Sequence, residues 1–430
     1  MFMNFIFLSP NFPKTYYHFT KCLKNNGVTT LGIGDEPYDQ LSEECRNSLV
    51  EYYKVSSLEN YDEVYRAVAF FAFKYGRIDW LETNNEYWLL RDAQLRTDFN
   101  ITTGLRNMNI DGIKYKSKMK EYYAKAGVPT ARYHLVDTLE NGLAFVKDAG
   151  YPVIVKPADY AGRKGITVCR CAEELDAAVE FAASKSQSKT IIVEDYLEGL
   201  EFASVYTLAD GKISLSCVNE KYITDDQERK SGLCEFLISP AASYNRYLEE
   251  LDGKLRTFIE GIGAKNGVIF FQGMVTEKKI YVFEMGYRIN GNNDFLVIDR
   301  FHGLNFMKMC IAHSLCGSMC DDISRDNPLY PEYACTLPVY AHGGTIGKLS
   351  LEGLREDPRI SNVTVSGWEG KQIPEDGSTA QCVLKLKLFA PTLEEVVDAV
   401  KYAQRHIEVT DIGGKNMLFK PFDADCLLNS

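Results

Sequence analysis

The stretch from Tyr151 to Ile166 contains residue types that could bind a triphosphate. Val153–Val155 read as a short buried strand, Lys156 follows at its end, and Ala161-Gly-Arg-Lys-Gly-Ile166 forms a glycine loop. Lysine supplies a compact positive charge, and glycine lets backbone N–H groups approach phosphate oxygens. An exposed hairpin with a basic tip would have the same local sequence, so the interpretation depends on motifs further along the chain.

Two later motifs add carboxylates and a guanidinium. The sequence Ile191-Ile-Val-Glu-Asp-Tyr-Leu-Glu-Gly-Leu-Glu201 predicts a buried strand that ends in acidic residues and turns through Gly199 into another strand. The sequence Tyr281-Val-Phe-Glu-Met-Gly-Tyr-Arg288 places Glu284 at a strand end and Arg288 four residues later. A carboxylate can hold Mg²⁺ on phosphate oxygens, and a guanidinium can neutralise phosphate or carboxylate charge.

The composition describes an ordinary soluble protein and excludes several classes of function. At 430 residues the chain is long enough for two to four domains, and its formal charge of −11 argues against a nucleic-acid partner. No apolar run approaches the roughly 20 residues that cross a bilayer, so no membrane partner is expected. The twelve scattered cysteines predict free thiols in a reducing cytoplasm, and neither they nor the six histidines show zinc-site spacing.

The first 112 residues alternate between strand and helix patterns. We expect strands at Phe5–Ser9, Thr30–Ile33 and Ile78–Trp80, with helices at Tyr16–Asn25 and Asp62–Tyr75. This alternation predicts a parallel sheet with covered faces.

The rest of the chain mixes strands and helices less regularly. A helix is expected at Lys114–Ala126, and residues 130–200 carry patterns for three strands and two helices. Four more strands and a helix are expected up to residue 317, interrupted by the polar stretch Asn219–Gly232, which is either a recognition loop or a solvated linker. The tail predicts strands at Ala334–Tyr340 and Cys382–Phe389 and a helix at Leu393–Arg405.

In order and spacing, these motifs resemble the ATP-grasp superfamily, most closely its carboxylate–amine ligases: L-amino acid ligases, D-alanine–D-alanine ligase and carbamoyl phosphate synthetase-like proteins. The resemblance implies a mixed α/β and α+β fold. Residues 1–112 would form a Rossmann-like N-terminal domain, and residues 113–320 the two ATP-grasp subdomains, with a lid at about 130–200. Residues 321–430 would form a small C-terminal α+β domain.

The resemblance also implies a role for each motif residue. Lys116 and Lys156 would contact phosphates, Glu194 and Leu197 would present backbone groups to adenine, and Glu201 would bind the ribose. Glu284 would be the principal metal ligand, with Arg288 beside the transferred phosphoryl group and the substrate carboxylate. The loop over the β and γ phosphates would consist of Ala161, Gly162, Arg163, Lys164 and Gly165.

Two positions depart from the family pattern. Where many members have a first acidic metal ligand, this chain has Gln272, and the asparagine that usually follows the second ligand is replaced by Gly286. Asn290 is expected to substitute as a ligand, or else one metal ion is held more weakly.

The implied activity is an ATP-dependent ligation of a small carboxylic acid and an amine, with amino acids as candidates for both. The acid would be activated as an acylphosphate, with release of ADP and phosphate. The implied cofactors are ATP and Mg²⁺, with Mn²⁺ a possible substitute, and a homodimer is possible. Two alternatives stay open: a bicarbonate-activating carboxylase or carbamoyl phosphate synthetase-like enzyme, and a nucleotide-binding subunit without turnover.

Overall fold

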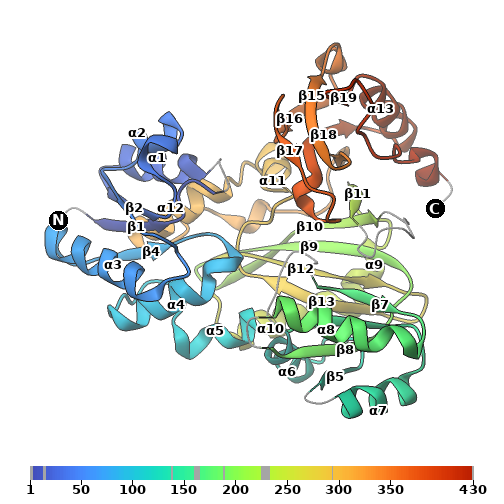
Figure 1. Ribbon diagram of the computed structural model, residues 1–430, viewed down its shortest axis with the longest axis horizontal. Helices are drawn as coiled ribbons and strands as arrows, with labels where there is room; N and C mark the ends of the chain where they lie inside the picture. The colour runs from blue at the N-terminus through green and yellow to red at the C-terminus, as the bar shows by residue number, and fades with distance from the viewer. Residues whose placement is uncertain are drawn as a thin grey trace.

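The computed structural model describes residues 3–12, 16–136, 139–158, 165–186, 189–223, 233–292 and 294–428. In Figure 1 the N-terminal part (blue) lies to the left of the central sheet, the C-terminal segment (red) lies above it, and residues of about 130–200 (green) lie below it. In the described part of the chain, no helix is long and apolar enough to cross a membrane.

The N-terminal part contains a parallel sheet with the strand order β3-β2-β1-β4. All five residues of β1 are buried, as expected for a strand with both faces covered. The expected strand at Ile78–Trp80 begins two residues later, and the edge strand β3 was not predicted because its tyrosines are half exposed. The elements are β1 (Asn4–Leu8), α1 (Tyr17–Asn25), β2 (Thr29–Gly34), α2 (Glu43–Ser48), β3 (Glu51–Lys54), α3 (Tyr61–Tyr75), β4 (Trp80–Glu82) and α4 (Leu89–Asp98).

Two short helices replace the single helix predicted at Lys114–Ala126. These are α5 (Asn107–Lys114) and α6 (Lys116–Lys125), and Tyr115 between them has an extended backbone. The prediction of the helix end was right, because the backbone leaves the helix at Ala126 just before Gly127. The break makes Lys116 the first residue of α6.

A four-stranded antiparallel sheet follows, with the order β5-β8-β6-β7. Helices α7 and α8 contact this sheet, and its buried side chains form a cluster separate from the main core. The elements are β5 (Tyr133–Val136), α7 (Leu139–Ala149), β6 (Val153–Pro157), β7 (Thr167–Cys169), α8 (Leu175–Lys185) and β8 (Ile191–Asp195).

The central sheet has eight strands in the order β13-β12-β9-β10-β11-β14-β18-β16. It crosses the expected boundary at residues 320 and 321, because β11 pairs with β14 from the C-terminal segment. The domain boundaries stay a prediction. The strands are β9 (Leu200–Ala209), β10 (Lys212–Ile223), β11 (Cys234–Ser239), β12 (Gly267–Val275), β13 (Ile280–Gly286), β14 (Tyr333–Tyr340), β16 (Ile360–Val365) and β18 (Cys382–Ala390).

Strand β10 extends into the stretch that the sequence predicted to be a polar loop. Residues Asn219–Ile223 belong to this strand, where Glu220 pairs with Phe202 and Lys221 with Glu201 of β9. The polar residues of this stretch stay in the sheet because their side chains find hydrogen bonds or counter-charges there. Residues 224–232 lie outside the described residues.

The helices that pack on the central sheet lie between its strands in the sequence. The expected helix at Arg246–Gly261 is a continuous run of α9 (Tyr244–Tyr247), a π-helical turn (Leu248–Asp252) and α10 (Gly253–Gly261). After β13 come α11 (Asp294–His302) and α12 (Phe306–Cys316), and α12 contacts both β12 and α1.

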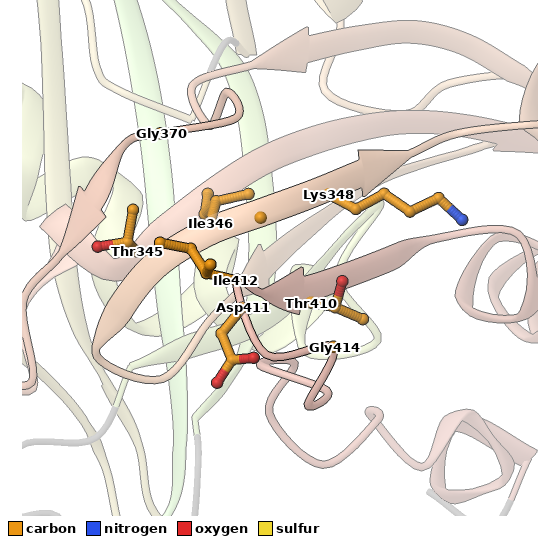
Figure 2. Close-up of a pocket in the computed structure, with 9 residues that line it drawn as sticks. Thr345, Ile346, Lys348, Gly370, Thr410, Asp411, Ile412 and Gly414 are labelled. Atoms are coloured by element: carbon orange, nitrogen blue, oxygen red, sulfur yellow. The ribbon is translucent and has the colours of Figure 1, made fainter.

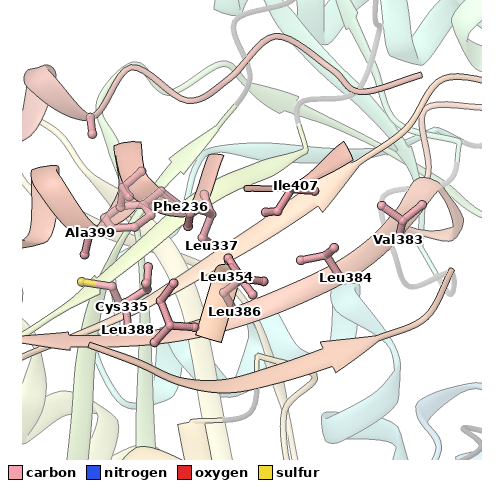
Figure 3. Packing of buried hydrophobic residues seen from close by; sticks show 14 of the residues in the cluster. Phe236, Cys335, Leu337, Leu354, Val383, Leu384, Leu386, Leu388, Ala399 and Ile407 are labelled. Atoms are coloured by element: carbon pink, nitrogen blue, oxygen red, sulfur yellow. The ribbon is translucent and has the colours of Figure 1, made fainter. Parts of the chain in front are cut away.

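The C-terminal segment adds a small sheet of order β17-β15-β19 and the helix α13 (Leu393–Arg405). Its strands are β15 (Gly344–Ser350), β17 (Gln372–Ile373) and β19 (Glu408–Asp411). Figure 3 shows the apolar cluster that joins it to the central sheet, which includes Phe236 of β11, Leu337 of β14, and Leu384 and Leu386 of β18. The C-terminal segment thus shares one core with the strands that precede it.

Candidate nucleotide-binding site

A buried ion pair connects β6 and β8 at the centre of the predicted site. Lys156 lies near the end of β6, and Glu194 lies on the antiparallel neighbour β8, where it pairs with Ile154. The Lys156 Nζ is 2.6 Å from Glu194 Oε2, and both side chains are buried. The strand that the sequence predicted therefore brings the lysine to the expected position at its end, but with a carboxylate partner that the sequence did not reveal.

Helix α6 contributes two more lysines to this site. Its first turn is tied to the end of β6, because the Lys116 N–H donates to the Ala158 carbonyl at 3.2 Å. Lys120 lies one turn further along the same face, and its Nζ is 3.1 Å from Glu194 Oε1. Lys120 was missed by the sequence analysis, although its spacing of four residues from Lys116 on a predicted helix was the available signal.

The carboxylate of Glu284 joins this cluster from the other side. Its Oε2 is 3.0 Å from the Lys116 Nζ. Burial alone would raise the pKa of Glu284, but Lys116, together with Lys156 and Lys221, lowers it to about 2. Gln272 of β12 is the direct cross-strand partner of Glu284 on β13, so an amide and a carboxylate lie side by side.

Glu201 has a counter-charge of its own. It lies opposite Lys221 in the pairing of β9 with β10, and the Lys221 Nζ is 2.7 Å from Glu201 Oε2. Glycine is required just before this strand, since a Cβ on Gly199 would lie 2.1 Å from the Val275 carbonyl oxygen. Lys221 was missed because it lies in the stretch that was expected to be a loop.

Arg288 is held by a carboxylate from the N-terminal part. Its two guanidinium nitrogens contact Glu86 Oε2 at 2.6 and 3.2 Å, and the guanidinium lies over the Phe270 ring, 5.0 Å from its centre. The same ring fills the space beside Gly286, where a Cβ would be 2.3 Å from the Phe270 Cζ. Phe270 therefore occupies the space of the side chain that the family pattern has at position 286.

Asn290 has protein partners for both ends of its amide. Its Nδ2 donates to Asp294 Oδ2 at 2.6 Å, and its Oδ1 accepts from the Asn292 N–H at 3.3 Å. Asp294 is also close to Lys387, whose Nζ is 3.4 Å from its Oδ1. Asn290 thus belongs to a buried polar network in this structure, and its role as a metal ligand stays a prediction.

The glycine loop is only partly described. Ala161, Gly162, Arg163 and Lys164 lie outside the described residues, while Gly165 follows them with a φ of +82°, which favours glycine. Leu197 is half buried in the segment between β8 and β9. The roles predicted for these residues are not tested by the structure.

The geometry brings six predicted residues together from six elements, namely α6, β6, β8, β9, β12 and β13. Lys116 is paired with Glu284, and Lys156 with Glu194, which also contacts Lys120 on the helix of Lys116. Gln272 is the cross-strand partner of Glu284, and Glu201 lies on β9 beside β12. Burial would lower the pKa of Lys116, but the charge of Glu284 and, further away, that of Glu86 raise it. Such a cluster can exchange its carboxylate partners for phosphate oxygens and a divalent cation.

A surface hollow of about 480 Å³ lies elsewhere, between β15 and β19. Figure 2 shows that it is lined by Ile346, Ile412 and two threonines, and that the Lys348 side chain extends away from the other lining residues. The Lys348 ammonium is paired with Glu408 at 2.7 Å. This hollow contains none of the predicted site residues.

Comparison with known proteins identifies the family of this chain. The family model for the phosphoribosylglycinamide synthetase ATP-grasp (A) domain matches residues 114–292. The phosphoribosylamine–glycine ligase of Escherichia coli O157:H7 is 32% identical over 294 residues, which cover 63% of this chain and 67% of that protein. The chain belongs to the ATP-grasp family. This confirms the family that the sequence motifs predicted.

Other relatives match over shorter stretches. The phosphoribosylamine–glycine ligase of Clostridium acetobutylicum is 31% identical over 191 residues, which cover 40% of this ATP-grasp chain and 45% of that protein. The chain therefore spans less than half the length of this relative.

The fold itself matches a solved structure along nearly the whole chain. The L-amino acid ligase from Bacillus licheniformis superimposes with a TM-score of 0.77 at 16% identity, covering 95% of this chain and 98% of that one. The predicted fold class is thereby confirmed.

Proposed function

We propose that this ATP-grasp protein is an ADP-forming ligase that joins a small carboxylic acid to an amine. The observation that carries the proposal is the two ion pairs Lys156–Glu194 and Lys116–Glu284, which helix α6 connects because its Lys120 also contacts Glu194. Groups that suit phosphate and metal binding are thereby collected from β6, β8, α6 and β13. The ligase relatives support the reaction type. The acid, the amine and the whole reaction sequence are part of the proposal.

The lysines would bind the triphosphate by exchanging partners. Lys156 and Lys116 are each held by a carboxylate in the structure, so phosphate oxygens would replace Glu194 and Glu284 as their counter-charges. Charge-assisted hydrogen bonds from lysine to phosphate are about twice as strong as neutral ones. Glu194, Leu197 and Glu201 would hold the adenosine part in the predicted way.

The residues at the metal position fit a hard divalent cation. Glu284 and Gln272 are cross-strand partners on β13 and β12, and both side chains carry oxygen atoms of the kind that Mg²⁺ prefers. Within the described ranges, no group of three or more His, Cys, Asp or Glu side chains could hold a metal by itself. This suits Mg²⁺, or Mn²⁺ in its place, because Mg²⁺ typically takes one or two protein ligands and completes its shell with phosphate oxygens and water. When bound, the cation would neutralise phosphate charge.

Arg288 would act at the reacting centre. Its guanidinium would leave Glu86 and bind the substrate carboxylate beside the γ-phosphate, so that a carboxylate oxygen attacks phosphorus and ADP departs. The amine then attacks the carbonyl carbon of the acylphosphate, phosphate leaves and an amide forms. Positioning and charge stabilisation account for most catalysis of this kind, and exclusion of water protects the acylphosphate.

Several finer assignments belong to the same proposal. The substrates are small molecules with amino acids as the first candidates, and the proposal includes a homodimer. We place the protein in the cytoplasm, which suits twelve cysteines that are all free thiols. The relatives do not favour bicarbonate activation, while the neutral Gln272 and Gly286 keep a binding subunit without turnover as the alternative to be tested.

The decisive experiment measures phosphate release from ATP–Mg²⁺ with panels of acids and amines. We expect release to require both substrates and hydroxylamine to trap the acylphosphate as a hydroxamate. Glu284→Gln should abolish release while ATP still binds, and Arg288→Lys should lower turnover more than ATP affinity, because lysine lacks the planar fork. The control is Glu277→Gln, an exposed carboxylate in the β12–β13 turn.

Three results would contradict the proposal in different ways. Turnover that is unaffected by Glu284→Gln and Arg288→Lys would refute the assigned mechanism. Release with bicarbonate and no organic acid would favour the carboxylase alternative. A protein that binds ATP well but stays inert across the panels would favour the binding subunit.

A further inference from the structure

Two cysteines outside the predicted nucleotide site lie with their sulfur atoms in contact. Cys316 is the last residue of α12, and Cys320 follows it by four residues. Their Sγ atoms are 3.1 Å apart, and both residues are exposed to solvent. None of the chemistry proposed for the ATP-grasp site uses this pair.

The turn between these cysteines is held in place by specific contacts. Gly317 ends α12 in the left-handed conformation with a φ of +79°, and Cys320 also has a positive φ, of +52°. The Cys320 N–H donates to Ser318 Oγ at 3.1 Å, and the Ser318 hydroxyl donates to Asp210 Oδ2 at 2.7 Å. Asp210 lies in the turn between β9 and β10, so the central sheet fixes the turn that brings the sulfurs together.

We propose that Cys316 and Cys320 form a reversible dithiol–disulfide pair that is oxidised by low-molecular-weight disulfides such as glutathione disulfide. One cysteine thiolate attacks a sulfur of the small disulfide, and a mixed disulfide forms as one small thiolate leaves. The second cysteine thiolate attacks the protein sulfur of this mixed disulfide and displaces the second small thiolate. The two cysteines lose two electrons and two protons, and the small disulfide is reduced to two thiols.

The geometry favours the second of these steps. The sulfurs have to approach by only about 1 Å from their 3.1 Å separation to reach bonding distance. Exposure gives the small disulfide access to either sulfur. The hydrogen bond with Cys316 raises the pKa of Cys320, which lowers the fraction of the reactive thiolate. The proposal therefore concerns the ratio of disulfide to dithiol at equilibrium and not the rate at which the disulfide forms.

A zinc site is the obvious competing use of two neighbouring thiols. Structural zinc takes four ligands, whereas the part of the chain that the structure describes has no group of three or more potential ligand side chains.

The disulfide would instead close the last turn of α12. This helix contacts α1, and its His313 ring lies edge-on to Trp80, with the ring centres 5.4 Å apart, so the pair lies at the end of a helix that joins two parts of the molecule.

The test uses the full-length protein in glutathione buffers of graded redox potential, followed by alkylation and mass spectrometry. We expect one oxidised species that lacks two hydrogens, with ten of the twelve cysteines still open to alkylation after unfolding. Cys316→Ser and Cys320→Ser should each abolish this species and leave a mixed disulfide on the remaining cysteine. The matched control Cys22→Ser should keep the cross-link.

A comparison with the unfolded chain shows whether the fold favours formation of the Cys316–Cys320 cross-link. In concentrated urea, the equilibrium constant for forming the cross-link should fall at least about tenfold, since thiol–disulfide equilibria follow the proximity of the two sulfurs. Stable mixed disulfides on Cys316 or Cys320 of the unchanged protein would overturn the proposal. So would a cross-link through other cysteines, or equal constants with and without urea.

Discussion

Replacing Glu194 by glutamine is expected to leave two buried lysines without their counter-charge. Glu194 is 2.6 Å from the Lys156 Nζ and 3.1 Å from the Lys120 Nζ. The three side chains are 3%, 7% and 1% exposed, respectively, so water cannot replace the lost carboxylate. Glutamine has nearly the same shape, and the substitution therefore tests charge and not packing.

The expected loss of stability is large for a single substitution. Removing one partner of a buried ion pair costs about 3–5 kcal/mol, against a total unfolding free energy of about 5–15 kcal/mol for a typical domain. Burial lowers the pKa of Lys120 even beside Glu194, and losing Glu194 should lower it further. A lysine whose folded pKa lies below its unfolded value makes stability rise with pH. The deficit of the variant should therefore shrink between neutral pH and pH values near 10.

The assay follows urea unfolding by tryptophan fluorescence, with hydrogen exchange of the β6 and β8 peptides to locate the effect. The matched control is Glu198→Gln, which removes an exposed carboxylate four residues further along. We expect the control to change stability by less than about 0.5 kcal/mol. The reasoning is refuted if Glu194→Gln is as stable as the control, or if its deficit does not depend on pH.

Three further outcomes follow from the same contacts. Lys156→Ala should weaken ATP binding measured by calorimetry roughly ten- to hundred-fold, whereas Lys118→Ala on the exposed face of α6 should leave it unchanged. Gly286→Asn should destabilise the fold by about 1–3 kcal/mol in urea without tightening metal binding, and combination with Phe270→Ala should remove the clash. Because Lys116 and its neighbours hold the pKa of Glu284 at about 2, against an ordinary 4.5, the stability from this carboxylate is present above pH 4.5 and lost as pH falls towards 2. Glu284→Gln should lack that part of the acid unfolding profile, and identical profiles would contradict the assignment.

The sequence predicted those features that short-range patterns determine. Helix α13 begins and ends at the predicted residues, because its valines and alanines repeat at helical spacing and Thr392 caps its first turn. The position of Lys156 near the end of β6, and those of Gln272 and Glu284 on strands, could be expected for a similar reason. Each lies in a short apolar run whose period and length identify a strand.

The contacts that connect these motifs could not be predicted in the same way. Arg288 and Glu86 are separated by 202 positions, and nothing in either local sequence indicates that they meet. The continuity of the central sheet from β11 to β14 likewise depends on tertiary pairing. The Lys114 Nζ likewise donates to the Glu86 carbonyl at 3.0 Å, a contact between residues that are 28 positions apart.

The departure from the family pattern at Gly286 is explained by contacts that only the structure reveals. Gly286 reads as a lost ligand in the sequence, but the structure shows the Phe270 ring in the space that a side chain there would need. Arg288 lies over the same ring. Gly286 and Phe270 therefore fit together in this chain, and asparagine at position 286 alone would clash with the ring before it could provide an oxygen.

Four positively charged side chains of the predicted site are each paired with a carboxylate, and this pairing affects ligand binding. Lys156, Lys116, Lys221 and Arg288 are each within 3.0 Å of a carboxylate oxygen. A polyanionic ligand must break these pairs when it binds. The favourable free energy of binding is therefore only the difference between the interactions of these cations with phosphate and their interactions with carboxylate. A metal ion that takes Glu284 frees Lys116 for a phosphate, and a phosphate that takes Lys116 frees Glu284 for the metal. Because linkage is reciprocal, the Lys116–Glu284 pair should make nucleotide and metal favour each other's binding.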